Sequence, residues 1–358
     1  MFDSVFKNII VATVISLTFF LGYINPSHNW DMIGYVASAF HMDGLSGQEL
    51  LDATYDLVEK EVSEGMFVSL IQGDFRSVVY KDHTSLEQLL PFYTPRVLYI
   101  GSMMFLGELG VSYAESSYLV SSIFAAASVF VVALILKQFS VSIYLLPFVV
   151  VFSGLINLAR YSTPDAMACF FALTAFYMLI SGRLYYLVIA AILPLVRTDF
   201  VILSLLFSIC GVFSQRKLAA LMSGFVAILF YLAINREMGN YGWFTIFNFT
   251  LIDMNPYPKD MEISIYWKDY LRPYISTAWS VFNHLHGLVF LIALTLWLTA
   301  KKKISSEMFV EDRALWICFI FVVLHLLAFP AYMDRFFTFS VIICLIYIFS
   351  KVLKVEQS

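Results

Sequence analysis

Long apolar runs recur from one end of the chain to the other, and they constrain its fold more than any other feature. Runs of about 20 apolar residues match an α-helix that crosses the hydrocarbon core of a bilayer. The runs lie near 8–24, 113–136, 141–159, 165–181, 184–196, 199–214, 218–235, 279–300, 314–331 and 336–350. Of the 358 residues, 60% are hydrophobic and 13% charged, whereas a soluble domain has about 25% charged residues. The sequence predicts an all-α polytopic membrane protein, a single membrane domain over residues 1–358 with about ten transmembrane helices.

Basic residues at the ends of these runs predict the orientation of the chain. With ten spans and a cytoplasmic N-terminus, most lysines and arginines of the short turns face the cytoplasm, as the positive-inside rule requires. They are Lys7, Lys137, Arg183, Arg216, Lys217, Lys301, Lys302, Lys303, Arg313, Lys351 and Lys354. A further apolar run, 97–110, is short and contains Glu108, so we do not count it as a span. We expect a multi-pass protein of the bacterial inner (cytoplasmic) membrane with both termini in the cytoplasm.

Two long polar segments, 25–112 and 236–278, then form a first and a second outer loop. In the first loop, Ser46 to Glu49 and Thr84 to Glu87 match the capping box that begins many helices. Apolar residues follow each box at helical spacing, which predicts juxtamembrane amphipathic helices on the membrane surface. Between them, the stretch around Gly73 suggests a small β-hairpin.

Three short outer turns each hold an arginine and an aspartate, although outer turns are usually poor in basic residues. Charges so close to hydrocarbon often mark a functional site. One interpretation is that each pair is a local ion pair that anchors a helix end. We favour a shared anion-binding cavity, because three such turns face the same side as Asp31, which follows the first run. The three pairs are Arg160 with Asp165, Arg197 with Asp199, and Arg335 with Asp334.

These residue types suit the transfer of a group from a phosphate. Guanidinium forks match phosphate oxygens bidentately and stabilise the charge on a phosphate leaving group. A carboxylate such as that of Asp31 can take the proton of an attacking hydroxyl as a general base. Asp31 could instead serve only as the N-cap of a juxtamembrane helix, and the two roles are compatible.

The layout around Asp31 resembles the GT-C superfamily of integral-membrane glycosyltransferases. A first helix is followed by an outer loop that opens with D-x-x-x-Y-x-x-x-A (Asp31, Tyr35 and Ala39), and the stretch that begins at Ala159 resembles the third outer helix end of that family. The resemblance covers the layout of about the first 200 residues. It implies a fold with surface helices in the first outer loop and an outer-face active site.

The resemblance also implies roles for individual residues. Asp31 would be the catalytic base and Asp165 a second acid. The lipid-linked donor and its phosphate would be bound mainly by the three arginines, with further contacts from the first loop. The candidate donor-binding residues are Arg160, Arg197, Arg335, Tyr35, Arg76 and Lys81. For Arg76 and Lys81, a solvated loop charge is the more typical interpretation.

No resident cofactor or metal is expected. Many GT-C relatives carry two adjacent acids at the first site, whereas Met32 follows Asp31 here. This departure puts a divalent metal site in doubt and fits metal-independent relatives that use lipid-monophosphate sugars. His28 and His41 lie near Asp31, but without a clustered partner they are more typical of polar loop surface.

Two functions from different classes follow. The first is a glycosyltransferase that moves a sugar from a polyprenyl-phosphate donor to a hydroxyl of an outer-face glycan, lipid or protein, with inversion. The second is a transporter or flippase of lipid-linked glycans, although transporters usually place ionisable groups near the bilayer midplane. A structural subunit of a glycan-assembly complex is a third interpretation. Expected partners are the sugar donor, the acceptor and membrane lipids, with no nucleic acid.

Overall fold

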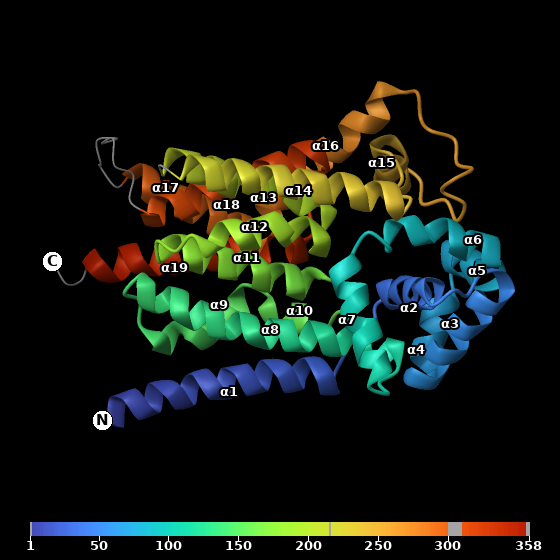
Figure 1. Ribbon diagram of the computed structural model, residues 1–358, viewed down its shortest axis with the longest axis horizontal. Helices are drawn as coiled ribbons and strands as arrows, with labels where there is room; N and C mark the ends of the chain where they lie inside the picture. The colour runs from blue at the N-terminus through green and yellow to red at the C-terminus, as the bar shows by residue number, and fades with distance from the viewer. Residues whose placement is uncertain (1, 215, 300–309, 356–358) are drawn as a thin grey trace.

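The computed structural model describes residues 2–214, 216–299 and 310–355, and within these ranges the chain is entirely helical (Figure 1). Nineteen α-helices and three short 3-10 segments are present, and no strand is formed in the described ranges. The all-α prediction is therefore confirmed. Lys301–Lys303, which we predict to be cytoplasmic, lie outside the described residues.

A bundle of helices running side by side forms the larger part of the molecule (Figure 1). The buried centre of the bundle lies where α8, α11, α12 and α19 meet, and small residues such as Ala125, Ala172 and Ala190 allow close approach there. The bundle helices are α1 (Phe2–Ile24), α8 (Tyr113–Gln138), α9 (Leu146–Phe152), α10 (Leu155–Arg160), α11 (Asp165–Ile180), α12 (Tyr185–Val196), α13 (Val201–Phe213), α14 (Lys217–Glu237), α17 (Leu285–Thr299), α18 (Val310–Ala328) and α19 (Asp334–Val355).

The prediction of ten spans is wrong, because many of these helices do not qualify as membrane spans. Among the described residues, four helices are long and apolar enough to cross a membrane: α1, α8, α14 and α19. The bent pair of α17 with α16 (Trp267–Asn283) raises the number to five if it counts as one span. Most of the remaining apolar helices are too short: α11 has 16 residues and α12 has 12, about 24 and 18 Å, against a hydrocarbon core of about 30 Å. The 19 residues of α18 include Glu311, Asp312 and Arg313, which make it too charged for a candidate span. The described helices support a multi-pass membrane protein with four or five candidate spans.

The break in the run 141–159 has a clear cause. Gly154 adopts a left-handed conformation with a φ of 77°, which ends α9 and separates it from α10. Glycine enters this region without steric cost, so an apolar run that contains it need not form one continuous helix.

The long polar segments lie together at one end of the bundle, opposite to the end where α1 begins and α19 finishes (Figure 1). This arrangement agrees with both termini lying on one side and both loops on the other. The helices at the loop end are α2 (Asp31–Met42), α3 (Gly47–Glu61), α4 (Glu64–Ile71), α5 (Asp74–Lys81), α6 (His83–Leu89), α7 (Val97–Glu108) and α15 (Trp243–Leu251).

The two helices predicted from capping boxes are present as α3 and α6, but their first turns differ from the prediction. Ser46 is the N-cap of α3 without a side-chain cap bond, and the N–H of Gly47 instead donates to Oε1 of Glu87 at 2.7 Å. In α6 the cap is Asp82, whose carboxylate accepts from the N–H of Thr84 at 2.9 Å. Glu87 therefore links the two helices rather than closing its own capping box.

The predicted hairpin around Gly73 is wrong. The stretch forms two short helices, α4 and α5, and Gly73 separates them with a φ of 103°. Phe67, Leu70 and Val79 are buried on one side of the pair. A turn around a glycine with positive φ joins helices as readily as strands.

The two outer loops form one layer rather than separate segments. Asp82 accepts a hydrogen bond from the hydroxyl of Tyr257 at 2.6 Å, and Asp260 accepts one from Nε2 of Gln88 at 2.6 Å. The Ser85 hydroxyl donates to the backbone carbonyl of residue 256 at 2.6 Å. These bonds join α5 and α6 to the segment after α15, so the second loop lies on the first.

Candidate functional site

Asp31 and Arg335 lie against each other at the loop end of the bundle, although the sequence separates them by most of its length. Nη1 of Arg335 donates to Oδ2 of Asp31 at 2.8 Å. Nε of the same guanidinium lies 3.4 Å from Oδ2 of Asp165. Arg335 therefore links two carboxylates that come from α2 and α11.

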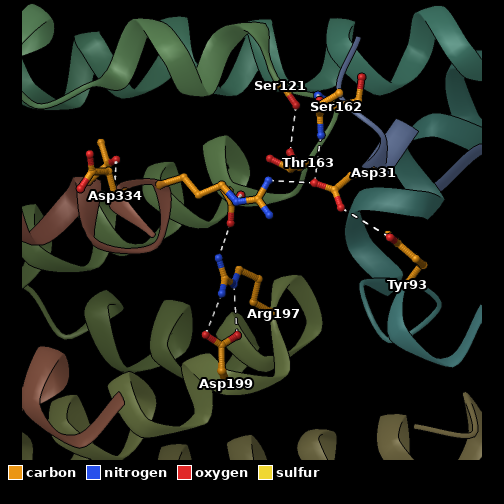
Figure 2. Close-up of polar contacts among 12 residues, drawn as sticks. Asp31, Tyr93, Ser121, Ser162, Thr163, Arg197, Asp199 and Asp334 are labelled. Carbon is orange, nitrogen blue, oxygen red and sulfur yellow. Dashed lines mark hydrogen bonds and ion pairs between the residues drawn. The ribbon is translucent and has the colours of Figure 1, made fainter. Parts of the chain in front are cut away.

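The chain of charges continues away from Asp31. Arg197 donates through Nη1 to Asp165, and its other donors form a bidentate pair with Asp199, at 3.1 Å from Nε and 2.9 Å from Nη2 (Figure 2). The carboxylate of Asp199 also lies 3.1 Å from Nε2 of His325. We call these six residues the charge network: Asp31, Arg335, Asp165, Arg197, Asp199 and His325.

The two halves of the charge network differ in exposure. The side chains of Asp165 and Arg197 are 3% and 6% exposed, whereas those of Asp31 and Arg335 are 27% and 25% exposed. Buried ion pairs are strongly coupled, because each charge depends on its partner once water is excluded. The buried Asp165 and Arg197 can therefore fix the geometry of Asp31 and Arg335, which retain enough exposed surface to meet a ligand. Asp199, at the other end of the network, is 28% exposed.

Most of the aspartates at the loop end lie at or next to the first residue of a helix. Asp31, Asp165 and Asp334 are the first residues of α2, α11 and α19, and Asp199 lies in a 3-10 turn (Thr198–Phe200) directly before α13. The positive end of the helix dipole stabilises a carboxylate at such a position. The short polar turns thus bring acids from separate parts of the chain to one end of the bundle.

The surroundings of Asp31 hold its side chain in place. Nδ2 of Asn29 donates to its Oδ2 at 2.9 Å, and Oδ1 of Asn29 accepts from the N–H of Ser162 at 2.9 Å. The hydroxyl of Tyr93 lies 3.5 Å from Oδ1 of Asp31 (Figure 2). Burial raises the pKa of Tyr93 well above its usual range, so this phenol stays protonated and is a donor. Trp30 rather than Asp31 is the N-cap of α2, so pure capping does not explain this carboxylate.

Gly34 lets the ring of Tyr93 reach this position. A Cβ at residue 34 would lie 2.5 Å from the Tyr93 ring, closer than carbon atoms can approach. The glycine falls inside the D-x-x-x-Y motif, between Asp31 and Tyr35. The motif therefore supplies both the acid and the space for a second group beside it.

The structure brings together four of the predicted site residues and leaves the others apart. Asp31, Asp165, Arg197 and Arg335 belong to the charge network. Nε of Arg160 donates to the backbone carbonyl of Asn25 at 2.7 Å, which ties α10 to the end of α1. Nη1 of Arg76 donates to the carbonyl of Ser69 at 2.6 Å, and Lys81 is exposed at the end of α5.

Tyr35 lies beside the charge network without joining it through a hydrogen bond among the described residues. It is buried edge-to-face between Tyr93 and Tyr99, with ring centroids 5.1 and 4.9 Å away. Burial also raises the pKa of Tyr35 above its usual range. Its contacts are those of a packing residue that supports Tyr93.

Of the three local ion pairs considered from the sequence, only Arg197 with Asp199 forms. Arg160 does not pair with Asp165, and Arg335 turns away from Asp334 toward Asp31. Asp334 instead lies 3.4 Å from Nδ1 of His284 and 3.5 Å from Nδ1 of His286. The charges are thus shared between helices.

Sequence analysis missed His325, Asn29 and Tyr93. The sequence signal for His325 is its position as an isolated polar residue inside the apolar run 314–331, and the structure shows its side chain 5% exposed. Asn29 and Tyr93 carry no such signal, because polar and aromatic residues are common in loops. Their roles depend on the packing of α2 against the turn before α7.

A divalent metal does not fit the charge network. Asp31 and Asp165 both face the guanidinium of Arg335, and Asp199 is held by Arg197 and His325. Within the described ranges, no group of three or more His, Cys, Asp or Glu side chains is arranged to hold a metal ion. A cation would have to displace arginines that already neutralise these carboxylates.

Comparison of the chain with protein-family models, with curated proteins and with solved structures gives no match. The class that the fold itself defines is an all-α, multi-pass membrane protein with a charge network at the loop end of its bundle.

Proposed function

We propose that this chain is a GT-C-type membrane glycosyltransferase that moves a sugar from a polyprenyl-phosphate donor to an acceptor hydroxyl at the loop end of the bundle. The observation that carries the proposal is the contact between Asp31 and Arg335, which are partly exposed and are backed by the buried Asp165 and Arg197. The donor class comes from the resemblance of the D-x-x-x-Y layout to that family.

Asp31 would act as the general base. The acceptor hydroxyl gives its proton to this carboxylate while its oxygen forms a bond to the anomeric carbon. The bond from that carbon to the phosphate oxygen breaks on the opposite face, and the lipid phosphate leaves with the electron pair. A positioned general base contributes about 10²–10⁴ in rate.

Arg335 would stabilise the leaving phosphate. Its side chain is 25% exposed, with Nη1 on Asp31 and Nε 3.4 Å from Asp165, so a phosphate oxygen would bind on the exposed side of the guanidinium in competition with Asp31. One guanidinium–phosphate contact at about 4 Å contributes on the order of 4 kcal/mol at an effective dielectric near 20, before desolvation. As Arg335 turns toward the phosphate, its hold on Asp31 weakens, and the carboxylate becomes a stronger base.

Arg197 would act as a positioning residue rather than a phosphate ligand. All three of its nitrogen positions already contact Asp165 or Asp199, and its guanidinium lies 4.1 Å from the centre of the Phe336 ring. It therefore fixes Asp165, which in turn faces Arg335.

The position of the charge network favours group transfer over transport. Its members lie at or close to helix ends, whereas transporters usually hold ionisable groups near the bilayer midplane between broken helices.

The direct test of the class is mass spectrometry of cell-surface glycans and lipids from cells with and without this protein. If the protein is a glycosyltransferase, cells without it should lack one sugar residue on a defined acceptor. A complementary assay follows lipid-linked glycan across vesicles that contain the purified protein. Movement of intact lipid without any change of covalent linkage would instead identify a flippase.

A further inference from the structure

The helix α16 presents an apolar face that the described parts of the chain leave uncovered. Its large side chains recur every three or four residues along one side of the helix, as in an amphipathic helix that meets an apolar surface. Trp267 and Trp279 are 67% and 73% exposed. We call this face the α16 stripe, and it consists of Trp267, Leu271, Ile275, Trp279 and Phe282.

A bend turns α16 away from the direction of α17. The two helices meet at His284 and differ in direction by 76°, and α16 stands near the loop end of the molecule (Figure 1). Gly287 makes the bend possible, because a Cβ there would lie 1.6 Å from the carbonyl oxygen of Val281. If α17 runs with the bundle through the bilayer, α16 lies close to the membrane plane, which is the orientation of interfacial helices.

Contacts to the end of α18 hold α16 in that orientation. The hydroxyl of Tyr274 donates to the carbonyl of Leu327 at 2.9 Å, and the hydroxyl of Thr277 donates to the carbonyl of residue 330. Thr277 and Pro273, one turn apart, are the buried residues of α16 and mark its covered side. The exposed face is thus fixed outward rather than free to fold back.

A polar cavity and an apolar groove adjoin on α16. The cavity, of about 500 Å³, lies between α16, the end of α15 and the segment before α19, and its lining includes Asp269 and Ser280. The groove, of about 440 Å³, is lined by Trp267, Leu271 and Ile275 with Lys268. Arg272 and Ser276 line both. An amphiphile with its charged group at this junction would match both spaces.

The charge at the junction is positive. Lys268 and Arg272 are one helical turn apart and exposed, and neither has an ion-pair or hydrogen-bond partner in the described ranges. The nearby carboxylate of Asp269 accepts a hydrogen bond from Ser264 at 2.6 Å. Exposed basic residues beside an apolar helix face are typical of segments that bind anionic lipid head groups.

We propose that α16 is an interfacial helix that binds an acidic phospholipid of the adjoining leaflet, with the phosphate on Arg272 and Lys268 and the acyl chains along the α16 stripe. This inference does not rest on the proposed glycosyl transfer. Lipid binding at α16 and transfer at Asp31 are measured separately, so either can fail without the other.

The test uses the full-length protein reconstituted into phosphatidylcholine nanodiscs that contain 10% phosphatidylglycerol. Brominated acyl chains quench the fluorescence of nearby tryptophans. In one set of nanodiscs the phosphatidylglycerol is brominated, and in the other an equal fraction of the phosphatidylcholine is brominated. The fluorescence quenching of Trp267 and Trp279 is obtained by subtracting the quenching of the W267F/W279F variant from that of the wild type. We expect stronger quenching by phosphatidylglycerol than by phosphatidylcholine.

Arg272→Gln should reduce this preference about fivefold, and Lys268→Gln with Arg272→Gln should abolish it, since each cation near an anionic surface contributes a factor of about five. Arg236→Gln is the matched control, because Arg236 is an exposed arginine at the end of α14 whose partner is its neighbour Glu237. Gel filtration and a thermal melt verify that each variant is folded.

Three outcomes would overturn the proposal. Absence of quenching in both sets of nanodiscs would place α16 away from the bilayer. Equal quenching in both sets, unchanged by Arg272→Gln, would leave an apolar contact without a phosphate site. Loss of the preference in 10 mM inorganic phosphate would show a site for soluble phosphate rather than for a lipid.

Discussion

Arg335 contacts both Asp31 and Asp165, so one side chain links the exposed and the buried halves of the charge network. At the scale of residues, this linkage means that Arg197 acts on Asp31 only through other groups. Substitutions in the buried half should therefore change stability, whereas substitutions near Asp31 should change the rate.

Arg197→Gln should destabilise the protein by about 3–5 kcal/mol, because it leaves the buried Asp165 without one partner and Asp199 without its bidentate pair. Thermal unfolding of the purified variant in detergent measures this loss. Arg183→Gln, an exposed arginine at the opposite end of the bundle, should leave the melting temperature unchanged. An Arg197→Gln protein as stable as the wild type would mean that these ion pairs contribute nothing to folding.

Gly34→Ala should lower the transfer rate about fivefold. The added methyl group would displace the Tyr93 ring and remove its hydroxyl from Asp31, and one hydrogen bond contributes about 1 kcal/mol. Steady-state kinetics with a lipid-linked donor measures the effect. Gly101→Ala is the control, because nothing lies within 4 Å of a Cβ at that position. Equal rates for the two variants would show that the Tyr93 hydroxyl does not contribute to transfer.

The sequence predicts the arginines and aspartates of the charge network, exposed and buried, better than its histidine. Arginines in short outer turns and an acid after the first run stand out by their sign and position. Arg160 has the same signal as Arg197, yet it binds the carbonyl of Asn25. The difference depends on how α10 meets the end of α1, and helix packing of this kind has no local signature in the sequence.

At the scale of elements, the outer layer depends on bonds between segments that are distant in sequence. Capping boxes correctly predict helices at α3 and α6, because those signals are local. The hydrogen bond between Asp82 and Tyr257, which joins the two loops, has no local signal in the sequence.

Asp82→Asn should loosen the outer layer in a pH-dependent manner. The hydrogen bonds from Tyr257 and from the N–H of Thr84 hold the pKa of Asp82 below its usual value. The contribution of the carboxylate to stability is therefore fully present above about pH 4 and is lost as the pH falls through the lowered pKa. The wild type should melt higher than the variant at pH 7, and the difference should narrow as the pH falls below about 4.

Thermal melts of the wild type and Asp82→Asn between pH 7 and pH 2.5 measure this difference. Tyr257→Phe should reproduce the effect in part, since it removes one of the two bonds. A difference that stayed constant over this range would show that the charge of Asp82 has no part in joining the loops.

At the scale of the whole molecule, the apolar runs predict a membrane bundle but not the number of its spans. Composition alone distinguishes a membrane protein from a soluble one. Gly154 divides one predicted run, and the runs at 165–181, 184–196 and 199–214 form helices of only 16, 12 and 13 residues, so four or five candidate spans remain among the described residues. The shorter helices are the ones that bring Asp165, Arg197 and Asp199 to the loop end.

The central claim is that the carboxylate of Asp31, held by Arg335, is the base for sugar transfer. The most direct measurement is the single-turnover rate of purified, reconstituted Asp31→Asn protein with saturating lipid-linked donor and acceptor. We predict a rate about 10²–10⁴ lower than that of the wild type, with unchanged donor affinity and thermal stability. Asp334→Asn, which alters an exposed aspartate outside the charge network, should transfer at the wild-type rate. Transfer by Asp31→Asn at the wild-type rate would contradict the account.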